Sequence, residues 1–408
     1  MSGWRLPTRV LVQPGAIGAL LPQVAASLGT RVALVTDPGL EATPWPQRVE
    51  AALRGAGLSV PLRFAKVEAN PRAATVDALA ADVRDSRADL VVALGGGSAI
   101  DAAKAAAMLA TNAGPCTSFE GKNKFSTKPL PLLAVPTTCG TGSEVTWVSV
   151  VTHEAQQRKM SIKGDLVFPA AAVVDAHVLR TLPHELVAYT GVDALTHAVE
   201  ATLCREGVRN PISCTLAEDA TALLFAHLRA AADGARRESD EAEAARDGVL
   251  RASTLAGMAF GNADVGAVHC LSESIGGVWD VPHGHGNAVF LAATLRHHLA
   301  AEDSARGGAH VRARLARLAA RCAADAPAAM ARADDRHKQS GAAATAEWFL
   351  SALDALVRDL RIPPFSALRL PRAEHARIAA LAVANGSNGS NPRELRADDY
   401  LQIMERAG

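Results

Sequence analysis

The sequence predicts an α/β N-terminal domain, built on a parallel sheet with helices on both faces, followed by an all-α C-terminal domain. The chain has 408 residues, which is long for a single hydrophobic core. Short apolar runs alternate with helical runs up to about residue 185, and longer alanine- and leucine-rich helical periodicity follows. We therefore expect two domains, residues 1–185 and 186–408.

The strands and helices of the first domain can be read in order. Apolar runs at 31–37, 60–65 and 88–97 have the length and composition of buried strands. The runs at 44–57 and 75–86 between them have helical spacing. Strands that alternate with helices are typical of βαβ units, which build parallel sheets.

Composition excludes several classes of protein. Lys plus Arg and Asp plus Glu are 42 each, so no global positive field attracts nucleic acid or an anionic membrane. The N-terminal residues lack the apolar segment of a signal peptide, and no stretch of 18 residues is uniformly apolar. Six cysteines without a CxxC pair are typical of free thiols in a reducing compartment. We expect a cytoplasmic location.

A glycine-rich turn ends the apolar run at 88–97. Glycines let the backbone approach a phosphate closely, and the free N–H groups at the start of the next helix favour its negative charge. A lone GGGS is equally compatible with a structural turn. The candidate cofactor-binding residues in this segment are Gly95, Gly96, Gly97, Ser98 and Asp101.

Asp37 closes the strand that begins at residue 31. A carboxylate at this position can accept hydrogen bonds from a ribose diol and repel a 2′-phosphate, which favours NAD over NADP. The alternative is that Asp37 simply caps a helix beginning at Pro38.

A second polar loop, PTTCGTGSEVT at 136–146, follows the apolar run LPLLAVP. Open α/β sheets bind ligands beyond the carboxyl ends of their strands, so this position favours a ligand-lining role over a plain connection. Its candidate hydroxyl groups are those of Thr137, Thr138, Thr141 and Ser143.

The second domain contains four potential metal ligands. Asp193 and His197 are four residues apart in a helical run, which places them on one helix face. His269 lies in a helix-like run, and His283 follows Pro282 in a predicted turn. Both lie in apolar, glycine-rich sequence, where an unpaired imidazole is costly. Mixed nitrogen and oxygen ligands suit Fe(II) or Zn(II), and the sequence leaves that choice open.

These residues resemble the iron-containing (group III) alcohol dehydrogenases. The matching stretches occur in family order over nearly the whole chain: GGGSAIDAAK, PTTCGTGSEVT, TLPHELVAYTGVDALTHAVEA, AGMAFGNADVGAVH, PHGHGNAVFL and NPRELRADDYLQIM. The resemblance implies an NAD-binding α/β domain at 1–185, a helical metal and catalytic domain at 186–408, and an active site in the cleft between them. It also implies that a metal ion is held by Asp193, His197, His269 and His283.

The same resemblance implies roles in cofactor binding. Gly96, Gly97 and Ser98 would contact the pyrophosphate, and Thr137, Thr138 and Thr141 would line the cofactor path. Lys159 matches a position near the cofactor, although a solvated surface charge is the alternative interpretation.

One residue departs from the family pattern. Many members have a histidine four residues after the third ligand, where this chain has Glu273. Glu273 could relay a proton, bind a polar group of the substrate, or orient a ligand imidazole. Ser387 and Asn388 lie in a loop that often varies near the substrate, or in a simple surface turn.

The expected activity is hydride transfer between NAD(H) and a small primary or secondary alcohol or aldehyde, and the sequence leaves open whether the substrate bears a polar or anionic group. The partners implied are this small molecule and further copies of the chain, as a dimer or larger homo-oligomer, without nucleic acid or membrane. Two alternatives remain: a non-redox, NAD- and metal-dependent enzyme similar to dehydroquinate synthase, and a regulatory protein without turnover.

Overall fold

The computed structural model describes residues 3–302, 310–332 and 341–408. The chain forms two compact units, one of residues Leu6–Leu182 and one of Pro183–Gly408 together with Met1–Arg5. The predicted α/β and helical fold class is confirmed.

A six-stranded parallel sheet forms the centre of the first unit. Its strands stand in the order β1-β9-β6-β4-β2-β3, and every neighbouring pair is parallel. Strands β2 and β4 are almost continuously apolar in sequence because both faces of the sheet are covered. The bounds are β1 (Arg9–Val12), β2 (Arg31–Val35), β3 (Ser59–Phe64), β4 (Leu90–Gly95), β6 (Leu132–Pro136) and β9 (Ala171–Val174).

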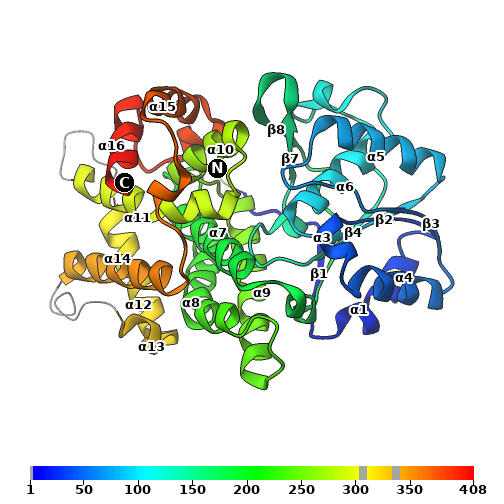
Figure 1. Ribbon diagram of the computed structural model, residues 1–408, viewed down its shortest axis with the longest axis horizontal. Helices are drawn as coiled ribbons and strands as arrows, with labels where there is room; N and C mark the ends of the chain where they lie inside the picture. The colour runs from blue at the N-terminus through cyan, green and yellow to red at the C-terminus, as the bar shows by residue number, and fades with distance from the viewer. Residues whose placement is uncertain (1–2, 303–309, 333–340) are drawn as a thin grey trace. The chain divides into compact units, whose positions relative to one another are not determined.

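Helices cover both faces of this sheet, as predicted. Figure 1 shows α5 and α6 on one face, with α1 and α4 on the other. The helices are α1 (Ala16–Ala19), α2 (Leu21–Ala26), α3 (Pro38–Glu41), α4 (Trp45–Gly55), α5 (Ala73–Asp85) and α6 (Gly97–Leu109). Buried alanines dominate α6, so that this helix packs closely on β4 and β6.

The sequence analysis did not predict the second, smaller sheet of this unit. It contains β5 (Gly121–Lys122), β8 (Arg158–Lys163) and β7 (Val148–His153), in that order. The antiparallel pair β7 and β8 packs its apolar side chains on the same core as α5 and α6. The polar loop at 136–146 therefore leads from one sheet into the other.

The described residues of the second unit form helices joined by loops and short turns, with no strand among them. Figure 1 shows α7, α8 and α9 packed together, and these helices have extensive mutual contacts. Its longer helices are α7 (His184–Leu203), α8 (Pro211–Asp233), α9 (Asp240–Gly261), α10 (Ala267–Trp279), α11 (His283–Glu302), α12 (Val311–Asp325), α14 (Gly341–Asp359), α15 (His375–Ala384) and α16 (Ala397–Ala407), with a short α13 (Pro327–Met330).

His283 differs from its predicted place in a turn. The turn lies just before it, with Asp280 in the left-handed region, and His283 is the first residue of α11. None of the described helices combines the length and apolar character needed to cross a lipid bilayer.

Candidate functional site

The α7 helix contributes Asp193 and His197 to a buried group of potential ligands. Four residues separate them, so both side chains project from one face, and they are only 2% and 5% exposed. The Nδ1 atom of His197 is 3.7 Å from Asp193 Oδ1. The ring of His197 stacks on Phe260 of α9, which fixes its orientation.

His269 and His283 converge on the same carboxylate from α10 and α11. Asp193 Oδ1 is 3.8 Å from His269 Nε2 and 3.6 Å from His283 Nε2. One ligand atom from each of these three residues lies within 4.8 Å of the other two. His197 lies beside this group rather than within it, with its ring tilted against that of His269 at a centroid distance of 4.4 Å. The structure thus brings all four predicted residues together.

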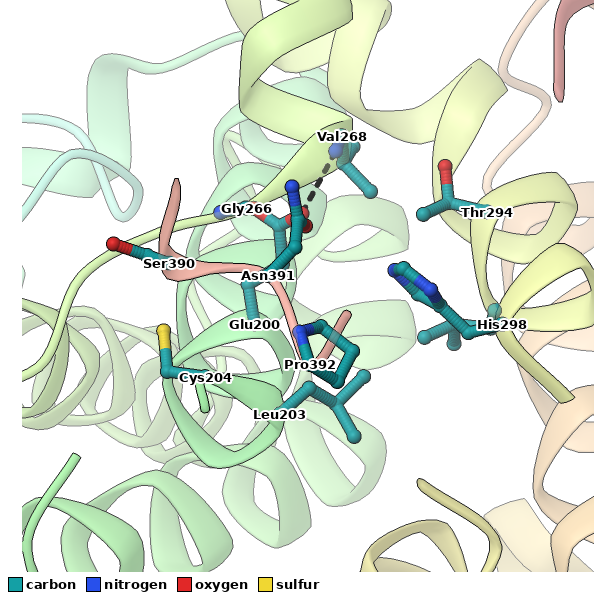
Figure 2. A pocket seen from close by; sticks show the side chains of 11 residues that line it. Glu200, Leu203, Cys204, Gly266, Val268, Thr294, His298, Ser390, Asn391 and Pro392 are labelled. Carbon is teal, nitrogen blue, oxygen red and sulfur yellow. Dashed lines mark hydrogen bonds between the residues drawn. The ribbon is translucent and has the colours of Figure 1, made fainter. Parts of the chain in front are cut away.

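Glu200, one turn beyond His197 on α7, orients His269. Its Oε2 atom is 2.6 Å from His269 Nδ1, and the carboxylate also accepts hydrogen bonds from the backbone N–H groups of Gly266 (2.8 Å) and Val268 (2.7 Å). Figure 2 shows Glu200 directed at the start of α10, where Gly266 has no capping side chain of its own. Glu200 therefore caps α10 and turns His269 Nε2 toward Asp193 and toward the Asn287 amide, whose Nδ2 atom is 3.2 Å away.

A small cavity lies behind Glu200, lined in part by Thr294, His298 and Asn391 (Figure 2). Burial, together with the charge of Arg393, lowers the pKa of His298 to about 3. His298 is therefore neutral near pH 7, so it places no positive charge beside the Glu200 carboxylate.

Polar side chains also hold the other members of the group. Ser272 Oγ is 3.3 Å from His283 Nδ1, and the same hydroxyl donates to Asn287 Oδ1 at 2.5 Å. The Asn287 amide in turn donates to Asp193 Oδ1 at 2.6 Å. Asn287 is completely buried, so these contacts fix Asp193 in one orientation.

The donor set fits a divalent transition-metal ion. Two atoms that each lie about 2.1 Å from one ion at a tetrahedral angle are about 3.4 Å apart, close to the distances from Asp193 to the histidines. Burial lowers the pKa of His269, but Glu200, Asp193 and Glu273 raise it, and the net shift is upward. Local negative potential thus favours a cation at this position. Imidazole with one carboxylate suits iron or zinc.

Glu273 lies one helical turn beyond His269 on α10. Its Oε2 atom accepts a hydrogen bond of 2.7 Å from Asn385 Nδ2, and the side chain remains partly exposed. His269 Nδ1 already bonds to Glu200, so the contacts of Glu273 do not match the orienting role considered for it.

In the first unit, the glycine turn joins β4 to α6. An added Cβ at Gly96 would be 3.0 Å from Thr138 Cγ2, and one at Gly97 would be 2.6 Å from Thr141 Cγ2. A Cβ at Gly97 would thus overlap Thr141, and one at Gly96 would be tightly packed against Thr138, so glycine lets both threonines lie close to the turn. The start of α6 at Gly96 has no side-chain cap, and an uncapped helix start of this kind can accept an anion.

The loop after β6, Thr137–Thr146, is termed here the hydroxyl loop. Thr137 N donates to Gly95 O at 3.0 Å, because β4 and β6 are neighbouring strands that end at the same edge. Thr138 and Thr141 are partly exposed beside the glycines, whereas Thr137 and Ser143 are buried. The hydroxyl loop thus presents two threonines to the turn and two hydroxyls to the interior.

Asp37 also lies at this edge. It caps α3 by accepting from Leu40 N at 2.9 Å, and its Oδ2 atom would be 3.3 Å from a Cβ at Gly95. Burial raises its pKa, partly offset by these backbone hydrogen bonds. Asp37 can therefore cap α3 and also lie beside the glycine turn. The strand order reverses between β2 and β4, where open sheets bind nucleotides.

The remaining candidates have mixed surroundings. Lys159, partly exposed on β8, exerts its charge on Asp101. Ser387 donates to Asp264 Oδ1 at 3.1 Å, and Asn388 Oδ1 accepts from Tyr400 at 2.7 Å, so both hold the loop before α16 in place.

Sequence reasoning missed Glu200 and Asn287. Glu200 offered one signal, an acidic residue one turn beyond His197 on a predicted apolar helix. Asn287 offered a similar signal, because it lies four residues after His283. The sequence predicts a turn at His283, so it does not show that the two residues share one helix face.

Comparison with known proteins gives matches over nearly the whole chain. The iron-containing alcohol dehydrogenase model matches residues 7–176, and the C-terminal model of the Fe-containing alcohol dehydrogenase family matches residues 187–408. The chain is 32% identical to 1,3-propanediol dehydrogenase of Citrobacter freundii over 411 residues, covering 100% of this chain and 99% of the relative. It is 29% identical to the NAD-dependent methanol dehydrogenase of Bacillus methanolicus over 412 residues, covering 100% of both.

A solved structure agrees with these relatives. The crystal structure of a 1,3-propanediol oxidoreductase superposes with a TM-score of 0.89 at 30% identity, covering 100% of both chains.

Proposed function

The chain belongs to the iron-containing alcohol dehydrogenase family, and from this premise we propose which residues hold the metal and cofactor and which substrates the enzyme takes. It is an NAD-dependent, metal-dependent oxidoreductase that transfers a hydride between NAD(H) and a small alcohol or aldehyde. The relatives do not favour the non-redox reaction considered from the sequence.

The metal ligands that we propose are Asp193, His197, His269 and His283. The observation that carries this proposal is the convergence of three ligand atoms within 4.8 Å from three helices, with Asp193 and His269 buried and His283 partly exposed. When bound, the metal ion supplies Lewis-acid polarisation of the substrate oxygen, and the nicotinamide supplies the hydride acceptor or donor.

The chain's own residues prepare this site. Glu200 fixes the tautomer of His269, because a proton on Nδ1 leaves the Nε2 lone pair directed at Asp193. The Asn287 amide holds the Asp193 carboxylate. These contacts place the donors before any ion binds, and preorganisation of this kind reduces the reorganisation needed during reaction.

For the cofactor, we propose that the glycine turn holds the pyrophosphate and that Thr138 and Thr141 line its path. Uncapped N–H groups at the start of α6 support this assignment. The Asp37 carboxylate beside Gly95 supports NAD, since a 2′-phosphate there would meet a negative charge.

The substrate that we propose is a short, neutral, polar alcohol, such as a diol, rather than an anion. Glu273 is partly exposed on the same face of α10 as His269, and Asn385 holds its carboxylate. A hydroxyl group of the substrate can donate to Glu273, whereas a carboxylate or sulfonate would be repelled. The named activity of the C. freundii relative agrees with a diol.

Two broader properties are also proposed. Homo-oligomerisation, as a dimer or larger, follows from resemblance to the family. A cytoplasmic location is supported by the six cysteines, all of which are free thiols.

The test is NADH oxidation by metal-free protein reconstituted separately with Fe(II) and Zn(II), using neutral and anionic short aldehydes. We expect one metal to restore turnover, with neutral hydroxyaldehydes preferred. His269→Ala should lose bound metal and turnover together, and His375→Ala, outside the site, should lose neither. Full turnover of His269→Ala without metal would exclude the proposed ligand set.

A further inference from the structure

A lysine lies buried beneath the cofactor loop and was not among the residues predicted from sequence. The Lys104 side chain, on α6, is 0% exposed. Its Nζ atom donates to Ser143 Oγ (3.0 Å), to the carbonyl and hydroxyl oxygens of Thr146 (both 3.1 Å) and to Val148 O (2.7 Å). Asp101 Oδ1 is 3.8 Å away.

Burial of an ammonium group is unfavourable unless its donors are satisfied and a countercharge is near. Here four oxygen atoms surround the three N–H donors, and Asp101 and Glu144 supply negative charge. An apolar side chain would avoid this desolvation altogether. The position of a buried lysine here therefore suggests a role in holding specific partners in place.

These partners all belong to one segment of the chain. Asp101 accepts from Ser143 Oγ and from Val150 N (2.9 Å), and its backbone oxygen accepts from Ser149 Oγ (2.7 Å). Together, Asp101 and Lys104 bind the end of the hydroxyl loop and the start of β7. Both residues belong to α6, the helix that begins at the glycine turn.

The spacing of residues along α6 connects the hydrogen bonds of Asp101 and Lys104 with the candidate cofactor site. Gly97, Asp101 and Lys104 are separated by four and then three residues, so they form one stripe on the helix. Gly97 meets Thr141, Asp101 meets Ser143, and Lys104 meets Ser143 and Thr146. The hydroxyl loop thus lies against α6 at the level of the glycines, where its two partly exposed threonines are found, and it is hydrogen-bonded to α6 at the levels of Asp101 and Lys104.

We propose that Lys104, together with Asp101, is a positioning residue that holds the hydroxyl loop against α6, so that Thr138 and Thr141 stay in register with the glycine turn for NAD(H) binding. This rests on the proposed function, because it takes the turn to be the pyrophosphate site. In this positioning role, Lys104 itself contacts no cofactor atom. Its loss acts on cofactor affinity rather than on the reaction at the metal.

The test compares Lys104→Met with Lys128→Met in the metal-loaded enzyme. Lys128 is exposed and controls for loss of one positive charge in the same unit. NADH affinity is measured by fluorescence titration, and kcat is measured at saturating NADH. We expect Lys104→Met to weaken NADH binding at least tenfold, while kcat stays within about threefold of the parent and metal content is unchanged.

A milder variant keeps the test decisive if Lys104→Met does not fold. Thr146→Val removes one acceptor of the ammonium at nearly constant volume, and we expect it to weaken NADH binding about threefold. The proposal is overturned if the folded Lys104→Met variant binds NADH as tightly as Lys128→Met does, or if its kcat at saturating NADH falls as far as its affinity for NADH. If only Thr146→Val folds, the proposal is overturned when that variant binds NADH as tightly as the parent does. Failure of the parent enzyme itself to bind NADH would instead refute the proposed cofactor site.

Discussion

At the residue scale, the charge of Glu273 should set the preference between neutral and anionic substrates. Its carboxylate lies one turn from His269 and is held by Asn385. At a separation of roughly 10 Å and an effective dielectric constant near 20, repulsion of an anion is about 1.5 kcal/mol, or roughly tenfold in rate. Glu273→Gln keeps the shape and removes the charge.

We therefore expect Glu273→Gln to raise kcat/KM for an anionic aldehyde about tenfold relative to a neutral one. Glu405→Gln, exposed on α16, should leave this ratio unchanged. Steady-state kinetics with matched pairs of aldehydes measure the ratio. An equal response of both aldehydes to Glu273→Gln would show that the carboxylate does not face the substrate.

Lys104 should also leave a signature in the pH dependence of stability. Burial lowers its pKa to about 8, and the charges of Asp101 and Glu144 offset this only in part. Between about pH 8 and 10.5 the unfolded chain keeps a proton that the folded chain has released, so stability from this group rises with pH across that window. The gain is lost again as the pH falls from about 10.5 to about 8, and below about 8 the lysine is protonated in both states, so this group gives no further change.

Denaturant unfolding of the parent and of Lys104→Met across pH 7–10.5 isolates this effect. The free energy of unfolding of the parent, relative to the variant, should increase with pH by up to roughly 3 kcal/mol. Ordinary lysines titrate equally in both proteins and cancel. A difference independent of pH would mean that the ammonium is not desolvated in the folded protein.

At the scale of elements, the start of α10 and its ligand histidine depend on a residue of α7. Glu200 accepts from Gly266 N, Val268 N and His269 Nδ1, so one carboxylate both caps the helix and orients its histidine. A shift of α10 along its axis would break all three bonds together. The positions of α7 and α10 are thus coupled through the residue that also prepares the metal site.

The junction of β4 and α6 leads to a prediction about Gly97. A Cβ at this position would be 2.6 Å from Thr141 Cγ2 and 2.8 Å from its Oγ1, so the hydroxyl loop must move to admit it. Gly97→Ala should weaken NADH binding at least tenfold and leave metal content unchanged. Gly18→Ala in α1, where an added Cβ meets no atom within 4 Å, is the matched control and should bind NADH as the parent does. Normal binding by Gly97→Ala would place the cofactor elsewhere.

At the scale of the whole molecule, patterns within single segments were predictable and contacts between segments were not. The strand before Gly95 and the shared helix face of Asp193 and His197 follow from local periodicity. Helical spacing is the only local signal of Glu200 and Asn287. The roles of these two residues and of Lys104 depend on partners that lie far away in sequence and come together only when α7, α10, α11 and the hydroxyl loop are packed. The sheet of β5, β8 and β7 was missed for a similar reason, since its strands are short and carry many polar residues.

Metal removal should affect one of the two units selectively. The proposed ligands come from α7, α10 and α11, all within Pro183–Gly408. A metal ion that binds only the folded state stabilises the elements that supply its ligands. We expect amide hydrogen exchange in these three helices to slow when Fe(II) or Zn(II) is added to metal-free protein, and to return to its former rate on chelation.

Strands β2, β4 and β6 of the other unit serve as the internal reference, because they supply no ligand. His283→Ala, loaded in the same way, should show little slowing in α10 and α11, since it removes one of the three converging donors. Slowing confined to β2, β4 and β6 would instead place the ion in the α/β unit. The exchange pattern therefore reports the location of the metal without requiring turnover, and it separates an error in the ligand set from an error in the choice of substrate.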